Sequence, residues 1–460
     1  MIGGLIEIFD EQSQAAAGEA EADRLMRHML AHAFCQGRHT ITGLLSAAGR
    51  QAQDWSADYR LYTSELDTVR LFEPIVRGVM QLLGPDQPLV LAVDDSILRK
   101  TGKKVDGVGW YRDPLGPAFH TNLAFALKFV QISAAIPDPN NPKRARMIPV
   151  AVAIAPKLPK PPKDADKQEL KAYEKAKQQN SPSNHAIALL TTLCEQIHNH
   201  DKHRRRPIWL AGDGHYTTTT VLQNLPDGVV YMGRCRKDLN LHALPSPSKR
   251  RGPGRPLAYG DRLPTPEQLR QDKQIEWKTI SIEYAGAKID IRIKHIQQAK
   301  WEKAGEKNVI QVIVIAPLRY RKTKYGPWRY TKPAYIICSD ASLPPEQVVQ
   351  AYFWRWDIEV NFRDEKQLFG ASQAQVRNPA SVTAAPSVAI AAYAGLVLAA
   401  LRTFGFTNVP PAVQLPKWRQ AKPPRRLTTQ DLLYQLRHEA AARLINLDRF
   451  MPSHAQTRST

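Results

Sequence analysis

Short apolar runs alternate with amphipathic segments along this chain, and the alternation predicts a mixed α/β protein. Two almost wholly apolar runs, at 88–93 and 208–212, are each followed at once by an aspartate, as in a buried strand whose end meets solvent. Strand patterns at 107–112, 123–136 and 147–154 follow the first run and predict antiparallel neighbours for it. We therefore expect a mixed sheet flanked by helices.

The same pattern divides the chain into five predicted segments. At the N-terminal end, apolar residues spaced by three and four predict helices, and Thr40 or Thr42 caps one that belongs either to a DNA-binding bundle or to a purely structural one. Strict alternation from about 274 to 333 predicts further strands. The segments are a helical N-terminal domain (1–85), the first part of an α/β core with a Pro- and Lys-rich insertion at 156–182 (86–240), a β-rich insertion with a basic loop (241–332), the last part of the core (333–405) and a basic, helical C-terminal tail (406–460).

The pattern predicts one long helix over 344–366. Pro344 and Pro345 suit a first turn whose amide hydrogens need no partner, and Gly370 supplies a stop. At about 100° per residue, one narrow face carries an aromatic ring, two cations and a carboxylate, from Tyr352, Arg355, Glu359 and Lys366. Beside it we expect an apolar stripe that packs on the sheet, formed by Val349, Phe353, Trp356 and Val360.

The charge of the chain indicates its partner. The 460 residues include 64 Lys and Arg against 43 Asp and Glu, a formal net charge of +21, so we expect a polyanion. We expect no apolar run of the about 18 residues that a membrane span requires and no signal sequence, which favours nucleic acid over lipid. The four cysteines lie far apart without a CxxC pair, which fits a reducing cytoplasm.

The most concentrated basic segment is 249–257, Lys-Arg-Arg-Gly-Pro-Gly-Arg-Pro-Leu. Its Gly-Arg-Pro core has the form of an AT-hook, which lies extended in the minor groove of A·T-rich DNA. A flexible loop that binds phosphates without sequence preference is the favoured interpretation. On either interpretation, the expected DNA contacts are Lys249, Arg250, Arg251 and Arg255.

The spacing of functional residues in the 344–366 helix is specific. Four residue types at four fixed offsets, namely Tyr352, Arg355, Glu359 and Lys366, resemble the signature of the DDE transposases of bacterial insertion sequences, in the group named for its Tyr, Arg, Glu and Lys. The resemblance covers roughly 88–370 and implies an RNase H-like catalytic core. It also implies that Tyr352, Arg355 and Lys366 hold DNA phosphates close to the metal site.

The same family has two aspartates upstream on strands, and the two apolar runs supply them. Asp94 and Ser96 meet the Asp-x-Ser context typical of the group, so we expect Asp94 as the first acid. Asp95 points to the opposite face of an extended strand and stays the alternative. Asp213 is the expected second acid and Glu359 the third. Carboxylate oxygens select hard cations, so the implied cofactor is Mg²⁺, with Mn²⁺ as a substitute.

The function that the resemblance implies is metal-dependent phosphodiester transfer, in which a transposase nicks transposon ends and joins the 3′-hydroxyl to target DNA. Two alternatives stay open: another RNase H-like nuclease such as a junction resolvase, and a transposase-derived regulator that binds DNA without cutting it. The expected partners are transposon-end and target DNA and a second copy of the chain, as a homodimer. The expected location is the bacterial cytoplasm, at the nucleoid.

Overall fold

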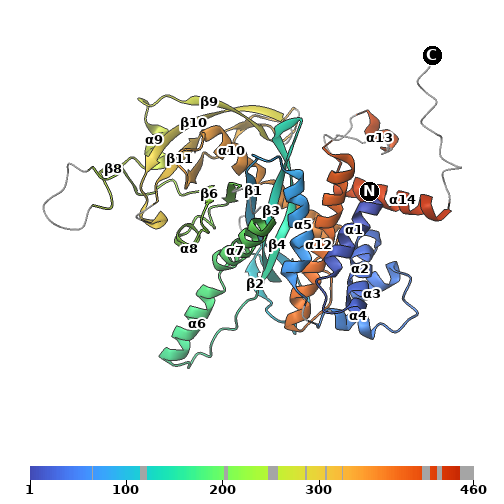
Figure 1. Ribbon diagram of the computed structural model, residues 1–460. Helices are drawn as coiled ribbons and strands as arrows, with labels where there is room; N and C mark the ends of the chain where they lie inside the picture. The colour runs from blue at the N-terminus through green and yellow to red at the C-terminus, as the bar shows by residue number, and fades with distance from the viewer. Residues whose placement is uncertain are drawn as a thin grey trace, which may run out of the picture. The chain divides into compact units, whose positions relative to one another are not determined.

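A computed structural model gives the fold of the chain (Figure 1). Two compact units are described separately below. Unit 1 comprises Met1–Ile75, Arg363–Val376 and Ala384–Thr460, and unit 2 comprises Val76–Phe362 and Arg377–Thr383. The structure describes residues 1–64, 66–113, 122–200, 206–246, 257–284, 287–305, 308–323, 325–406, 415–421 and 427–445.

Unit 2 is built on a ten-stranded mixed sheet. Its strands are β1 (Leu89–Arg99), β2 (Gly109–Arg112), β3 (Leu123–Asp138), β4 (Asn141–Ala155), β5 (Ile208–Gly212), β6 (Val229–Arg234), β9 (Lys278–Tyr284), β10 (Ala287–Ala299), β11 (Ile310–Ile315) and β14 (Ala334–Cys338). The order across the sheet is β2-β3-β1-β5-β6-β14-β11-β10-β9, with β4 paired to β3 off this path. The β1–β5 and β5–β6 pairs are parallel and the other pairs antiparallel, which confirms the predicted mixed sheet.

The strands predicted between 274 and 333 are confirmed, and they extend the same sheet. Every residue of β11 is buried, and β11 pairs with β14, which in turn pairs with β6. A strand with both faces buried cannot stand apart from the core, since it would expose apolar surface on both sides. Two short ribbons accompany the sheet: β7 (Leu241–His242) with β8 (Arg262–Leu263), and β12 (Arg319–Tyr320) with β13 (Arg329–Tyr330).

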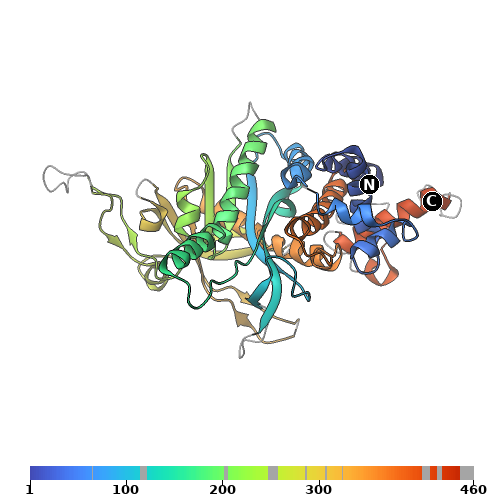
Figure 2. The same ribbon diagram turned by 90° about the horizontal axis from the view of Figure 1, so that it is seen from below.

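Unit 2 also contains helices, some of which pack on this sheet. They are α6 (Lys167–Gln179), α7 (Pro182–His200), α8 (Thr219–Gln223), α9 (Pro266–Gln271), the 3₁₀ turn η2 (Glu302–Ala304) and α10 (Pro345–Trp354). Figure 2 shows α7 alongside β3 and β4, which it contacts, whereas α10 contacts β4, β5, β6 and β9. The helix α6 projects from the sheet in Figure 1 and buries no residue, in keeping with its charged sequence.

Unit 1 is helical, as the pattern predicts for the N-terminal part of the chain. It holds α1 (Ile2–Ser13), α2 (Glu19–Phe34), α3 (Ile41–Ala47), α4 (Ser56–Leu61), α13 (Lys417–Gln420) and α14 (Thr429–Ile445), while α5 (Thr68–Leu82) begins in it. The Thr40 hydroxyl accepts a hydrogen bond from the Gly43 amide at 3.1 Å, so Thr40 caps α3 rather than Thr42. DNA binding by this segment stays a prediction.

The helix α12 (Pro379–Phe404) corrects one expectation. It has the length and apolar composition of a membrane span, so the expectation that the chain contains no such run is wrong. Its most apolar stretch, however, is wholly buried within the fold. Within unit 1, Gln12 donates to the carbonyl of Ala391 at 3.3 Å, and the rings of Phe369 and Tyr393 meet edge-on. The core helix of a folded protein has these same properties.

The predicted single helix over 344–366 is wrong, because the structure divides it into α10 and α11 (Asp357–Gln367). At the break, the amides of Ile358 and Glu359 donate to the carbonyls of Arg355 and Trp356, at 3.0 and 3.3 Å. These bonds span three residues and wind the chain more tightly than an α-helix. The break therefore changes which residues share a face.

The apolar stripe expected on this helix is wrong in the same way. Val349 is buried, but Trp356 is 49 % exposed, and Phe353 and Val360 are only half-buried. After the break, the buried apolar side chains are instead those of Ile358 and Phe362. The break thus presents a different face to the sheet from the one that a continuous helix would present.

Candidate active site

Asp94 lies within β1, at the point where this strand loses one of its two partners. The expectation that the strand ends at Asp94 is wrong, because β3 pairs with β1 as far as Arg99 and places Gln131 opposite Asp94. The other partner, β5, ends at Gly212, which lies opposite Val93. Asp94 is therefore the first β1 residue beyond the β1–β5 pairing.

Asp213 is the residue that follows β5 and lies beside Asp94 at the same end of two parallel strands. Its carboxylate accepts hydrogen bonds from the amides of His215 and Tyr216, at 2.8 and 3.3 Å, and these bonds shape the turn that leaves the sheet. Asp213 is half-buried. The structure thus brings the first two predicted acids together, although 118 residues lie between them in the sequence.

The pKa of Asp94 is raised to about 7: burial raises it most, the Arg355 guanidinium opposes that rise, and the negative charge of Asp213 adds to it. The distance from Arg355 Nη1 to Asp94 Oδ2 is 2.6 Å. Two carboxylates so placed repel each other, and a cation between them would relieve the repulsion. Oxygen donors of this kind fit a hard divalent metal ion.

Arg355 reaches Asp94 from the end of α10. Its side chain is only 8 % exposed, and its guanidinium carbon lies 5.6 Å from the ring centre of Tyr352 and 5.8 Å from that of Trp356. Its Nε is buried and has no hydrogen-bond partner among the described residues. Two residues of the Tyr–Arg–Glu–Lys signature, Tyr352 and Arg355, therefore lie together next to the first acid.

Asp95 has different partners from Asp94. One of its carboxylate oxygens accepts from Lys128 Nζ at 2.6 Å, and the other accepts from the Tyr216 hydroxyl at 3.1 Å. Both oxygens are thus engaged by donors of the protein. Asp94 is engaged in the same way, by the Asp95 amide at 2.9 Å and by Arg355 at 2.6 Å, so these bonds do not distinguish the two aspartates as metal ligands. The choice of Asp94 rests on its place beside Asp213, and the bond from Tyr216 to Asp95 ties β1 to the loop that carries Asp213.

Tyr216 is the residue that makes this connection. It is fully buried, three residues after Asp213, and burial together with the charges of Asp95 and Asp94 raises the pKa of its hydroxyl far above the usual range. Tyr231 supports the same loop, because its hydroxyl bonds to that of Thr217 at 3.0 Å. A side chain at Gly212 would clash with the Tyr231 hydroxyl, which explains the glycine before Asp213. Tyr216 is not among the site residues predicted from the sequence, where its position three residues after Asp213 is the one feature that points to it.

A Tyr216→Phe variant tests whether this hydrogen bond positions Asp213. For the predicted Mg²⁺-dependent cleavage of DNA, with Asp213 as the predicted ligand, we expect the Mg²⁺ concentration for half-maximal cleavage to rise roughly 10–100-fold, because the loop loses its tie to β1. At saturating Mg²⁺, kcat should largely recover, and DNA affinity without metal should stay unchanged. Titration of cleavage rate against Mg²⁺ measures the effect. Loss of kcat with no change in Mg²⁺ dependence would exclude a positioning role.

Glu359 does not join the two aspartates in this structure. It is exposed on the first turn of α11, and within the residues that the structure describes no three His, Cys, Asp or Glu side chains lie close enough to hold one metal ion. The aspartate pair fits a metal ion on the chemistry of its oxygens. The assignment of Glu359 rests on its position in the signature, four residues after Arg355.

The remaining predicted DNA contacts have different positions. Lys366 lies in the last turn of α11, in the part of that helix that belongs to unit 1. The basic-loop residues Lys249, Arg250, Arg251 and Arg255 lie outside the described residues. Their predicted contacts with DNA stay predictions.

Comparison with known proteins gives one positive result. A family model described as DDE superfamily endonuclease matches residues 14–306, which is more than half of the chain. A comparison with curated proteins found no match. The matched range includes both aspartates of the site and ends before α10 and α11.

Proposed function

Because the chain belongs to the DDE superfamily endonuclease family, we propose that it is a DNA transposase of the Tyr–Arg–Glu–Lys group, which nicks transposon ends and joins the 3′-hydroxyl to target DNA. The observation that carries the proposal is that Asp94 and Asp213 lie side by side where the parallel β1–β5 pairing ends. Arg355 of the signature contacts Asp94. Nuclease activity on DNA follows from the family. Strand transfer is the added step of the proposal.

Asp94 and Asp213 would hold Mg²⁺, or Mn²⁺ in its place, with Glu359 as a third ligand on the strength of its position in the signature. When bound, these ions supply a way to activate a water or a 3′-hydroxyl and to stabilise the leaving oxygen. Asp94 must lose its proton to act as a ligand, and its neighbour Arg355 favours the ionised form. Tyr216 and Asp95 keep the Asp213 loop in place against β1.

In the proposal, Arg355 has two partners in turn. It pairs with Asp94 in the structure, and its planar guanidinium also suits a two-point contact with a phosphate. DNA that reaches the site would offer this arginine a phosphate in place of the carboxylate, which leaves Asp94 free for metal. Tyr352 packs beside the guanidinium and limits its movement.

The proposal includes partners and location. The partners are transposon-end and target DNA, and the active form is a homodimer on DNA, since two ends must be joined in one event. The proposed place of action is the bacterial cytoplasm, at the nucleoid. The net charge of +21 favours binding to any DNA before the correct ends are found.

The test is incubation of the full chain with Mg²⁺ and duplexes that carry candidate ends, followed by a denaturing gel. We expect 3′-nicked ends and, with target DNA present, longer products in which end and target strands are covalently joined. Nicked products without any joined species would favour a junction resolvase or similar nuclease. Binding without nicking, in Mg²⁺ and in Mn²⁺ alike, would favour the non-catalytic regulator.

A further inference from the structure

The ribbon β12–β13 forms a projecting basic hairpin that has no role in the site described above. It lies beyond the residues matched by the family and pairs only with itself among the described strands, with Arg319 opposite Tyr330 and Tyr320 opposite Arg329. Figure 2 shows its two short tan strands projecting from the rest of unit 2. At its base the Thr331 amide donates to the Leu318 carbonyl, and the Leu318 amide donates to the Thr331 hydroxyl, both at 2.9 Å.

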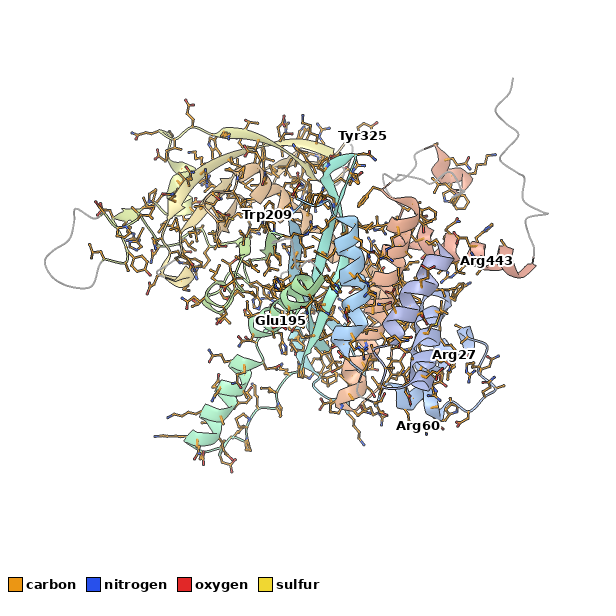
Figure 3. All side chains as sticks on the ribbon, in the orientation of Figure 1. Arg27, Arg60, Glu195, Trp209, Tyr325 and Arg443 are labelled. Carbon is orange, nitrogen blue, oxygen red and sulfur yellow. The ribbon has the colours of Figure 1, made fainter. Side chains whose placement is uncertain are left out.

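The composition of this hairpin is one-sided. Residues 316–333 contain six Lys or Arg and no Asp or Glu, so no carboxylate of the segment neutralises the cations. Its aromatic residues are unusually exposed, at 39 % for Tyr320, 88 % for Tyr325, 46 % for Trp328 and 66 % for Tyr330. Tyr325 is labelled in Figure 3 at the margin of unit 2, whereas Trp209 lies in the sheet. A structural ribbon has no need of such a surface.

Trp328 organises the charge of the hairpin. The guanidinium carbons of Arg319 and Arg321 each lie 3.9 Å from its ring centre. Two guanidinium groups at this distance cannot share one face of the ring, because their nitrogens would overlap. One therefore lies on each face, and both cation–π contacts restrict rotation of the arginine side chains.

This sandwich decides what the hairpin can bind. A guanidinium lies over each face of the indole, so a nucleobase could stack on Trp328 only by displacing one of the arginines. Trp328 holds two positive charges, those of Arg319 and Arg321, near each other. Because these charges repel, an anion with several negative charges would stabilise the arrangement. The phosphates of a DNA strand are such a repeated charge, and guanidinium groups bind them with geometric specificity.

We propose that the hairpin of β12 and β13 is a phosphate clamp for DNA, in which Trp328 holds Arg319 and Arg321 in position to bind the backbone of a duplex. The clamp binds DNA outside the catalytic centre and without sequence preference. The choice of DNA as the partner rests on the proposed function. Binding by the clamp needs no divalent metal and no chemistry.

The experiment measures affinity of the full chain for a labelled duplex without divalent metal, over a range of salt concentrations. An Arg319→Gln, Arg321→Gln double variant should bind about tenfold more weakly at low salt, and its slope of log affinity against log salt should fall by about 2, since each phosphate contact contributes about 0.9. Trp328→Leu should weaken binding several-fold although no charge is lost. The matched control is Lys171→Gln, Lys175→Gln on α6, which removes two exposed cations and should change the slope by less than half as much.

Several outcomes would overturn the clamp. They are an unchanged salt slope in the arginine variant, wild-type affinity in Trp328→Leu, an equal effect of the α6 control, and a loss confined to single-stranded DNA, which would indicate base stacking. Thermal melting establishes that each variant is folded. The same comparison in an Asp94→Asn background separates the two proposals: if cleavage proves unrelated to Asp94 but the hairpin effects persist, the clamp stands and the proposed function fails.

Discussion

An Asp94→Asn protein should cleave DNA more than about a thousandfold more slowly than the native chain in Mg²⁺, because the proposed metal ligand, worth several kcal/mol of transition-state stabilisation, is lost. The matched control is Asp95→Asn, one residue away on the same strand. Asp95 contacts Lys128 and Tyr216, so its replacement should slow cleavage only roughly 10–100-fold through the Asp213 loop. Single-turnover cleavage rates measure both. The reverse order of effects would assign Asp95 as the first ligand.

The pH dependence of metal binding provides a second readout for Asp94. Its pKa of about 7 lies above the ordinary value, so the carboxyl is protonated below pH about 7 and must release a proton to bind a metal ion. Mn²⁺ affinity of the DNA-free protein should therefore fall by up to tenfold per pH unit below about 7 and level off above it. Calorimetric titration measures this. In Arg355→Gln the fall should begin at higher pH, because the cation that lowers the pKa of Asp94 is gone. An unshifted profile in that variant would contradict the assigned role of the ion pair.

A Glu359→Gln protein should lose cleavage while it keeps its fold and its affinity for DNA. The substitution keeps the shape of the side chain but weakens it as a ligand for a hard cation. Because Glu359 is exposed on α11, the change should leave thermal stability within about 0.5 kcal/mol of the native value. We expect a fall in cleavage rate of about a thousandfold or more, of the same order as for Asp94→Asn.

The control for Glu359 is Glu346→Gln on α10. Glu346 is also a helix carboxylate, and it pairs with Lys278 at 3.1 Å, away from the aspartate pair. Its replacement should leave the cleavage rate within about twofold, as expected for an exposed ion pair. Normal cutting and joining by Glu359→Gln would show that this carboxylate is not a ligand. The signature on which the resemblance rests would then have been misinterpreted.

Local patterns in the chain were enough to predict the strands and most of the helices, and they supplied candidate acids whose roles stay predictions. Strand alternation, helix caps and charge are properties of neighbouring residues, and the spacing of Tyr352, Arg355, Glu359 and Lys366 lies within one short segment. The family match confirms the DDE family, but it ends at residue 306, so the Tyr–Arg–Glu–Lys subgroup stays a prediction. Prediction succeeded where the physical cause of a feature is local.

The decisive features of the site depend on strand partners that are distant in sequence. Asp94 and Asp95 are equivalent as neighbours in an apolar strand, and they differ because β5 ends beside one while Lys128 and Tyr216 reach the other. After the break that follows α10, Ile358 is buried and Trp356 is exposed, whereas helical periodicity had predicted that Trp356 would be buried. Pairing of distant strands and burial of particular side chains are settled by the free energy of the whole fold, so only the tertiary structure could decide them.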